Sequence, residues 1–145
     1  MTTAIDTGTP DLLASLDAGV LTLTLNRPEA RNAMSAAMNQ ALQQQLAAAE
    51  LDPAVKCVVL TGAGKGFCAG GDVKGMAASG DGTVGARTID EAIARQRINQ
   101  RATAGKLFKM PKPTIAALPG AAAGAGLALA LACDLRVMAS SAIMT

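Results

Sequence analysis

Two glycine-rich segments are the parts of this 145-residue sequence whose residue types could do chemistry. Residues 66–74 read Gly-Phe-Cys-Ala-Gly-Gly-Asp-Val-Lys, and residues 119–129 read Pro-Gly-Ala-Ala-Ala-Gly-Ala-Gly-Leu-Ala-Leu. Because glycine has no Cβ, main-chain N–H groups in such segments can approach an anion or a carbonyl oxygen closely. The second segment also opens an expected helix, whose first N–H groups have no internal acceptor. Each segment could bind a ligand through its backbone. A surface loop explains the first segment equally well, and the second segment taken alone favours a packing role.

Nucleotide-binding fingerprints fit these segments poorly. A phosphate-binding loop would need a glycine in place of Val59 and Ser or Thr in place of Gly66. A dinucleotide-binding turn over 124–129 would need a small residue in place of Leu129 and an acidic residue at the expected downstream distance.

The composition excludes several kinds of chemistry. The chain has no histidine, so Ser-His and Cys-His nucleophilic pairs and histidine metal sites cannot form within it, and we expect no metal site. Cys57, Cys68 and Cys133 lack CxxC spacing and follow no signal-peptide pattern, which predicts a reduced, cytoplasmic protein. A net charge of +2 without long runs of one sign argues against binding of nucleic acid. Catalysis would therefore rest on carboxylates, lysines or main-chain groups.

One uncharged stretch, residues 115–132, approaches the length of a membrane span and has Gly120 and Gly124 at GxxxG spacing. Pro119, several glycines and many alanines argue against a span, and Asp134 follows closely. We expect no membrane association, and the alternative predicts a protein that depends on detergent.

Hydrophobic periodicity predicts an α/β fold in which strands and helices alternate. Residues 17–19 form the turn of an N-terminal β-hairpin, Ser35 is a suitable helix N-cap, and Thr88 with Glu91 has capping-box spacing. The expected strands are 12–16, 20–25, 55–60, 114–118 and 135–138, and the expected helices are 35–50, 88–108 and 124–132. Mainly parallel pairing should follow the hairpin, and an irregular loop should lead to Ala86.

Taken together, the glycine segments resemble the fingerprints of the enoyl-CoA hydratase/isomerase (crotonase) family. Residues 60–62 leading to 67–74 are similar to the first fingerprint, and 112–117 through the turn to 132–135 are similar to the second. Residues 25–28 and 31–33 match the early strand-to-helix turn of the family. The resemblance implies a truncated crotonase-like ββα superhelix forming a single domain over 1–145. We expect its core over 10–145, disorder over 1–9, and further chain beyond the C-terminus, because family members continue for as much again.

The resemblance also implies an oxyanion hole in which the N–H groups of Gly71 and Ala125 bind the thioester oxygen of an acyl-CoA. Such donors stabilise an enolate more than the neutral ground state, which lowers the barrier. Residues implied to bind substrate or coenzyme A are Arg27, Ala30, Arg31, Ala69, Gly70, Gly71, Asp72, Val73, Lys74, Gly124 and Ala125. Among these, Arg27, Arg31 and Lys74 would meet the phosphates. No cofactor is expected beyond coenzyme A as part of the substrate.

The sequence departs from the family at Ala128, where hydratases carry a glutamate that positions or activates water. The other acid-base carboxylate of the family would fall beyond Thr145. A double-bond shift needs a single carboxylate, so isomerisation is slightly favoured over hydration. The alternative is a non-catalytic fragment that acts as a binding or partner module. The family implies an acyl-CoA partner and assembly into trimers or hexamers.

Overall fold

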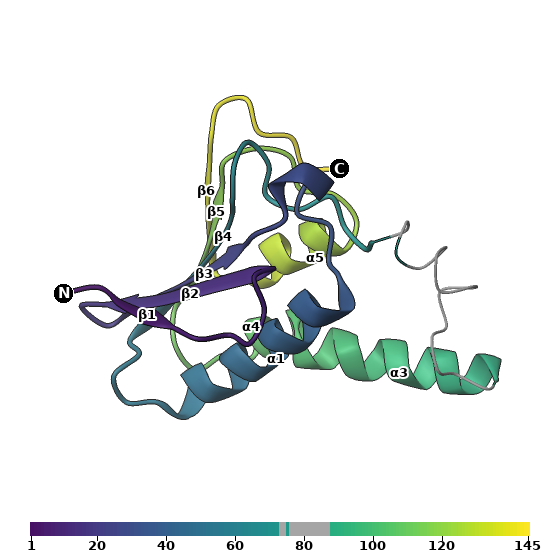
Figure 1. Ribbon diagram of the computed structural model, residues 1–145, viewed down its shortest axis with the longest axis horizontal. Helices are drawn as coiled ribbons and strands as arrows, with labels where there is room; N and C mark the ends of the chain where they lie inside the picture. Colours follow the sequence, from purple (N-terminus) through teal and green to yellow (C-terminus); the bar gives the residue numbers. More distant parts are fainter. Residues whose placement is uncertain (73–74, 76–87) are drawn as a thin grey trace.

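The structure is a computed structural model that describes residues 1–72, 75 and 88–145 (Figure 1). Val73, Lys74 and most of the loop expected to reach Ala86 lie outside the described residues.

One six-stranded sheet organises the chain, and its strands lie side by side in sequence order. The strands are β1 (Thr3–Ile5), β2 (Leu12–Asp17), β3 (Val20–Leu25), β4 (Cys57–Gly62), β5 (Thr114–Leu118) and β6 (Leu135–Met138). β1, β2 and β3 pair antiparallel, whereas β3 to β6 pair parallel. Ala18 and Gly19, with φ of 47° and 84°, form the two-residue hairpin turn between β2 and β3. The predicted α/β fold with an N-terminal hairpin and mainly parallel pairing is confirmed.

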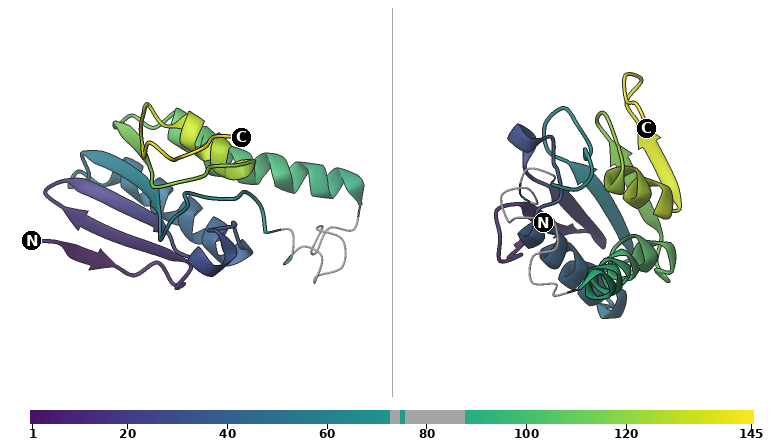
Figure 2. Two further views of the ribbon diagram at one scale, coloured as in Figure 1. Left: turned by 90° about the horizontal axis from the view of Figure 1, so that it is seen from above. Right: turned by 90° about the vertical axis from the view of Figure 1, so that its right-hand side faces the viewer.

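Three of the described helices lie on one face of this sheet. The described helices are the 3-10 helix η1 (Pro28–Ala30) and the α-helices α1 (Ala36–Leu51), α3 (Ile89–Ala102), α4 (Ala104–Phe108) and α5 (Ala125–Ala132). Figure 1 shows α1, α4 and α5 on the same side of the sheet, and Figure 2 shows α3 extending past the rest of the fold. Ser35 caps α1 as predicted, because its hydroxyl accepts a hydrogen bond from the Met38 N–H at 3.1 Å.

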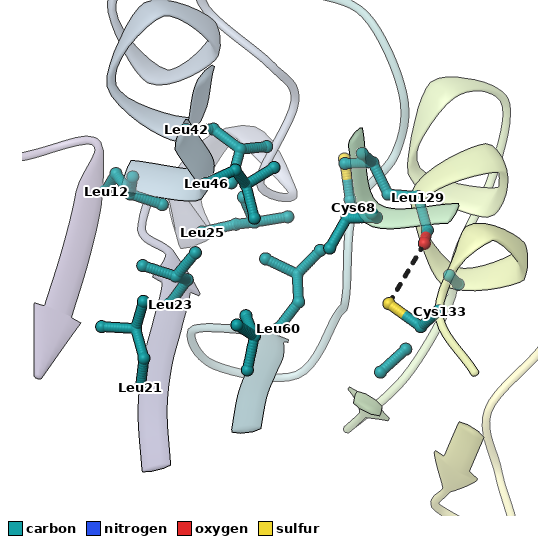
Figure 3. Packing of buried hydrophobic residues seen from close by; sticks show 14 of the residues in the cluster. Leu12, Leu21, Leu23, Leu25, Leu42, Leu46, Leu60, Cys68, Leu129 and Cys133 are labelled. Atoms are coloured by element: carbon teal, nitrogen blue, oxygen red, sulfur yellow. Dashed lines mark hydrogen bonds between the residues drawn. The ribbon is translucent and has the colours of Figure 1, made fainter. Parts of the chain in front are cut away.

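The core lies between the sheet and these helices. In β3, Leu21, Leu23 and Leu25 are buried and alternate with half-buried threonines, so one face of the strand points at the helices. In α1, Leu42 and Leu46 are fully buried at helical spacing. Figure 3 shows these leucines facing one another across the core. The burial of the leucine face against α1 holds the parallel strands and the segments at their ends in place.

The N-terminus differs from the prediction of disorder over 1–9. Thr3–Ile5 forms β1 and pairs antiparallel with β2, with Thr3 opposite Leu16. The free edge of β2 supplies backbone partners for a short segment of Thr and Ile, residues that favour strands. Thr2 and the N-terminal amine also bond to the carboxylate of Asp17, at 3.0 and 3.2 Å.

The predicted single helix over 88–108 is two helices that meet at Thr103. Thr88 caps α3 through a 3.2 Å bond from the Glu91 N–H, as its spacing predicts. At Thr103 the backbone leaves helical geometry, with φ −113° and ψ −91°, and its hydroxyl bonds back to the Asn99 carbonyl at 2.8 Å. A hydroxyl that bonds back in this way, followed by Gly105, favours a break in the helix. The break lets α4 bury Leu107 while α3 buries none of its residues.

Residues 115–132, considered as a possible membrane span, form most of β5, a turn and α5. None of the helices in the described ranges has the length and apolar character needed to cross a bilayer.

The two leucines Leu42 and Leu51 of α1 provide a test of this packing. Leu42 is fully buried and Leu51 is 83% exposed. We expect Leu42→Ala to lower the free energy of unfolding by about 2–5 kcal/mol, because it leaves a cavity in the core. Leu51→Ala should change it by less than about 0.5 kcal/mol. Denaturant titration measures both, and equal losses would contradict the assigned face of α1.

Candidate functional site

The first glycine segment is held between two other segments by main-chain hydrogen bonds. On one side, the Ala69 N–H donates to the Arg31 carbonyl at 3.0 Å, and Met34 forms an isolated bridge with Gly71. On the other side, Cys68 forms an isolated bridge with Ala122. Residues 67–72 therefore run as the middle strand of a small ladder, with 31–34 and 121–123 as its flanks.

This ladder brings the two glycine turns together. A Cβ added at Gly70 would lie 3.2 Å from the Ala123 carbonyl oxygen and 3.4 Å from the Ala125 nitrogen. Gly70 has φ of +104°, which side-chain-bearing residues rarely adopt. A Cβ at Gly126 would lie 2.4 Å from the Cys68 carbonyl oxygen, so the first turn of α5 packs directly on the first segment. Figure 3 shows Cys68 beside Leu129 of α5.

The amides of Gly71 and Ala125 are the two predicted donors. In the bridge between Met34 and Gly71, Met34 is bonded to the Gly70 carbonyl and the Asp72 N–H, so the Gly71 N–H points away from Met34. Ala125 is the first residue of α5, where an amide has no acceptor within the helix. Among the described residues, neither amide has a hydrogen-bond acceptor.

Gly71 and Ala125 line the same pocket, whose volume is about 630 Å³. Its other walls come from α1, α3 and the start of α5. Side chains with amide groups are frequent in these walls, and Gln43 of α1 donates to Asn99 of α3 at 3.2 Å across the pocket. The pocket-lining residues with amide side chains are Asn39, Gln40, Gln43, Gln96, Asn99 and Gln100. The pocket lining therefore combines two backbone donors with polar side chains.

Arg27 lies beside the first segment, within a cluster of charges. Its Nη1 donates to the Asp72 carboxylate at 2.9 Å and to the Ala33 carbonyl at 2.8 Å. Its Nε lies 3.7 Å from the Asp11 carboxylate, which also accepts a 2.5 Å hydrogen bond from the Ser35 hydroxyl. The Arg27 side chain is only 20% exposed. Arg27 thus makes internal contacts, which its position in a turn does not predict.

Asn32 is a second residue whose role the sequence analysis missed. It is fully buried with φ of 54°, and its side-chain nitrogen donates to the carbonyls of Ala63 and Gly66, both at 2.9 Å. Its side-chain oxygen accepts the Arg27 N–H at 2.9 Å. Asn32 therefore ties the turn after β3 to the turn after β4. The tolerance of Asn for positive φ was the only sequence signal for it.

The residues predicted to bind coenzyme A are distributed around this site. Asp72 lines the pocket with the two predicted donors, whereas Gly70 is buried and does not line it. Arg27, Ala30 and Arg31 lie on the far flank of the first segment and do not line the pocket. Ala69 and Gly124 are exposed beside the donors. Val73 and Lys74 are outside the described residues.

The buried cysteines support the site and are unsuited to nucleophilic attack. Burial raises the pKa of Cys68, and it raises the pKa of Cys133 to about 11. The sulfur of Cys68 accepts the Gly70 N–H at 3.4 Å, which helps to fix the turn before the Gly71 donor.

Asp134 ties two elements of the fold together through its carboxylate. Its carboxylate accepts the N–H and the hydroxyl of Thr114 at 2.8 and 2.9 Å. These bonds lower the pKa of Asp134 below its ordinary value, because they favour the charged form. They join the start of β5 to the end of α5.

Comparison with known proteins identifies the family. The family model described as enoyl-CoA hydratase/isomerase matches residues 15–145. The 1,2-epoxyphenylacetyl-CoA isomerase of Escherichia coli is 40% identical over 131 residues, which are 90% of this chain and 48% of that protein. Human mitochondrial enoyl-CoA hydratase domain-containing protein 2 is 41% identical over 133 residues, covering 91% of this chain and 42% of that protein.

Solved structures agree with this assignment. An enoyl-CoA hydratase/isomerase from Xanthobacter autotrophicus superposes with a TM-score of 0.82 at 32% identity, covering 92% of this chain and 48% of that chain. The chain belongs to the enoyl-CoA hydratase/isomerase family, and the predicted crotonase-like fold is confirmed. It spans about half the length of these relatives.

Gly70 and Gly66 form a matched pair for testing the contact between the two turns. Gly70→Ala places a methyl group against the second turn at a positive φ, so we expect a loss of about 1–3 kcal/mol in the free energy of unfolding. At Gly66 a Cβ would meet nothing within 4 Å. Gly66→Ala should therefore leave the melting temperature almost unchanged. If the two variants melt together, the turns do not pack as described.

Proposed function

We propose that this chain provides the substrate-binding half-site of an acyl-CoA enzyme, in which the N–H groups of Gly71 and Ala125 form an oxyanion hole. The observation that carries the proposal is the position of these amides, which line one pocket and have no acceptor among the described residues. A thioester carbonyl oxygen placed between them would accept both hydrogen bonds. As the α-carbon loses a proton, negative charge collects on that oxygen and the two bonds strengthen.

The reaction that we favour is the movement of a double bond along the acyl chain. Ala128 lines the pocket and carries no group that could activate water. Asp72 is the one acidic residue among the described pocket-lining residues, and it is paired with Arg27. The base must therefore come from outside this set, and isomerisation needs only one such group. The relative from Escherichia coli is named an isomerase of 1,2-epoxyphenylacetyl-CoA, so its name supports the isomerase class but specifies no double-bond shift.

Coenzyme A would lie along the exposed backbone of Ala69 and the turn at Arg31. Arg31 is exposed, and its side chain has no partner among the described residues, so it suits a phosphate group. Lys74 is a second candidate from the sequence. The three unpaired cysteines favour a reducing compartment, and we propose the cytoplasm, although the human relative is named as mitochondrial.

A non-catalytic role is the second candidate function. It is favoured by Ala128 and by the pairing of Asp72 with Arg27, which leave the described pocket-lining residues without an available proton-transfer group. In that case the chain would bind an acyl-CoA without converting it, as a binding or partner module. Conversion of an enoyl-CoA by the purified 145-residue chain would exclude this alternative.

Ligand-induced stabilisation tests binding directly. We expect a millimolar acyl-CoA thioester to raise the melting temperature, because a ligand at about 100 times its Kd stabilises a protein by about 2.7 kcal/mol. Differential scanning fluorimetry with and without the thioester measures this shift. An unchanged melting temperature at that concentration would count against both candidate functions.

Ala125→Pro tests the oxyanion hole. Proline is well tolerated at the first position of a helix, so this variant should delete one donor N–H and leave the fold intact. We expect turnover in the active enzyme to fall about 100- to 1,000-fold. Ala125→Ser keeps the N–H and is the matched control. Full activity in the proline variant would show that Ala125 is not a donor.

A further inference from the structure

We propose that Arg27 is a positioning residue that fixes the Gly71 donor through Asp72, and that it is not a ligand for the phosphates of coenzyme A. The inference rests on the proposed function, because it assigns Arg27 a task within the proposed oxyanion hole. It also revises the role that the family resemblance implied for Arg27.

The contacts of Arg27 are all internal. One guanidinium nitrogen, Nη1, bonds to the Asp72 carboxylate and to the Ala33 carbonyl, at 2.9 and 2.8 Å. Nε faces the Asp11 carboxylate at 3.7 Å. The guanidinium therefore links the start of β2, the turn before α1 and the residue that follows the Gly71 donor. Residues 27 and 72 are 45 positions apart, so this link closes a long stretch of chain.

Asp72 transmits this constraint to Gly71 because the two residues share a peptide bond. The Asp72 N–H also donates to the Met34 carbonyl at 3.3 Å, and the Met34 N–H donates to the Gly70 carbonyl at 2.8 Å. Gly71 thus lies between two residues, Gly70 and Asp72, whose main chains both bond to Met34. Arg27 bonds to the Asp72 side chain. Gly71 has no side chain of its own to fix its peptide plane, so its neighbours must set the direction of its N–H.

The surroundings of Arg27 disfavour a phosphate. Its side chain is 20% exposed, and the carboxylates of Asp11 and Asp72, also largely covered at 25% and 19% exposure, already balance its charge. A phosphate approaching the guanidinium would meet both carboxylates, and like charges at close range repel. Arg31, four positions away, is exposed, and no carboxylate pairs with it among the described residues.

The test compares ligands that do and do not carry the phosphates of coenzyme A. We would measure by calorimetry the affinity of the chain and its variants for an acyl-CoA thioester, for the matching acyl-pantetheine thioester without phosphates, and for free coenzyme A. The variants are Arg27→Gln, Asp72→Asn and Arg27→Lys. Arg97→Gln is the charge-matched control, because Arg97 is exposed on α3, lies outside the pocket and has no partner among the described residues.

A positioning role predicts that Arg27→Gln and Asp72→Asn each weaken binding of both thioesters about tenfold, and that Arg27→Gln leaves free coenzyme A unaffected. Arg27→Lys should keep more affinity than Arg27→Gln, because it retains the ion pair. Amide hydrogen exchange in the unliganded variants should accelerate at Met34 and Asp72 but not at Ala123. Arg97→Gln should change none of these quantities.

A phosphate-binding role for Arg27 would give the opposite pattern. Arg27→Gln would then weaken acyl-CoA and free coenzyme A while sparing the pantetheine thioester, and that result would overturn the inference. Unchanged binding of all three ligands in Arg27→Gln would overturn it as well.

Ala125→Pro in the same assay separates the two proposals. If Ala125→Pro weakens thioester binding and Arg27→Gln does not, only the positioning role fails. If neither thioester binds the unaltered chain, the proposed function fails and this inference fails with it.

Discussion

The site depends on one set of main-chain hydrogen bonds, those that hold residues 67–72 between 31–34 and 121–123. These bonds bring the Gly70–Gly71 backbone against the first turn of α5, although the two segments are more than 50 residues apart in the sequence. The parallel strands β4 and β5 make this possible, because adjacent parallel strands end at the same edge of a sheet and deliver their following turns side by side. Loss of that alignment would separate the two amides without removing either one.

The fold was largely readable from the sequence, because its strongest signals are local. Alternating leucines in β3, the N-cap at Ser35 and the apolar spacing of α1 each predict one element without knowledge of the rest. The structure differs from the prediction at two places where the local sequence signal is weak. Thr3–Ile5 pairs with the edge of β2, and a segment of three residues is too short for its own sequence to predict a strand. The break at Thr103 depends on a hydroxyl bond to the preceding turn, a choice that threonines in helices do not always make.

The same distinction applies to the site. The glycine segments could be predicted as backbone donors, because glycine lets main-chain N–H groups approach a ligand closely. The family resemblance then indicated which two amides would be the donors. The hydrogen-bond partners of Arg27 and Asn32 could not be predicted. An arginine or an asparagine in a turn can face solvent or bond to other parts of the chain, and its sequence does not distinguish the two. Only the structure shows that Arg27 faces carboxylates from two distant segments and that Asn32 joins the turns after β3 and β4. Both residues were in motifs already noted, but their tasks depend on contacts across the fold.

The ion pair between Arg27 and Asp72 also bears on the electrostatics of the proposed reaction. Asp72 is the residue next to the proposed Gly71 donor, so an unpaired carboxylate there would repel the negative charge that develops on an enolate oxygen. Pairing with Arg27 at 2.9 Å places an opposite charge beside that carboxylate and so reduces the repulsion. The carboxylate can then anchor the turn by accepting the Gly75 N–H at 3.0 Å without opposing the chemistry. An uncharged residue at position 72 would avoid the repulsion but would give up the link to Arg27. A carboxylate paired with an internal arginine satisfies both requirements, which is a physical reason for the two charges to occur together beside backbone donors.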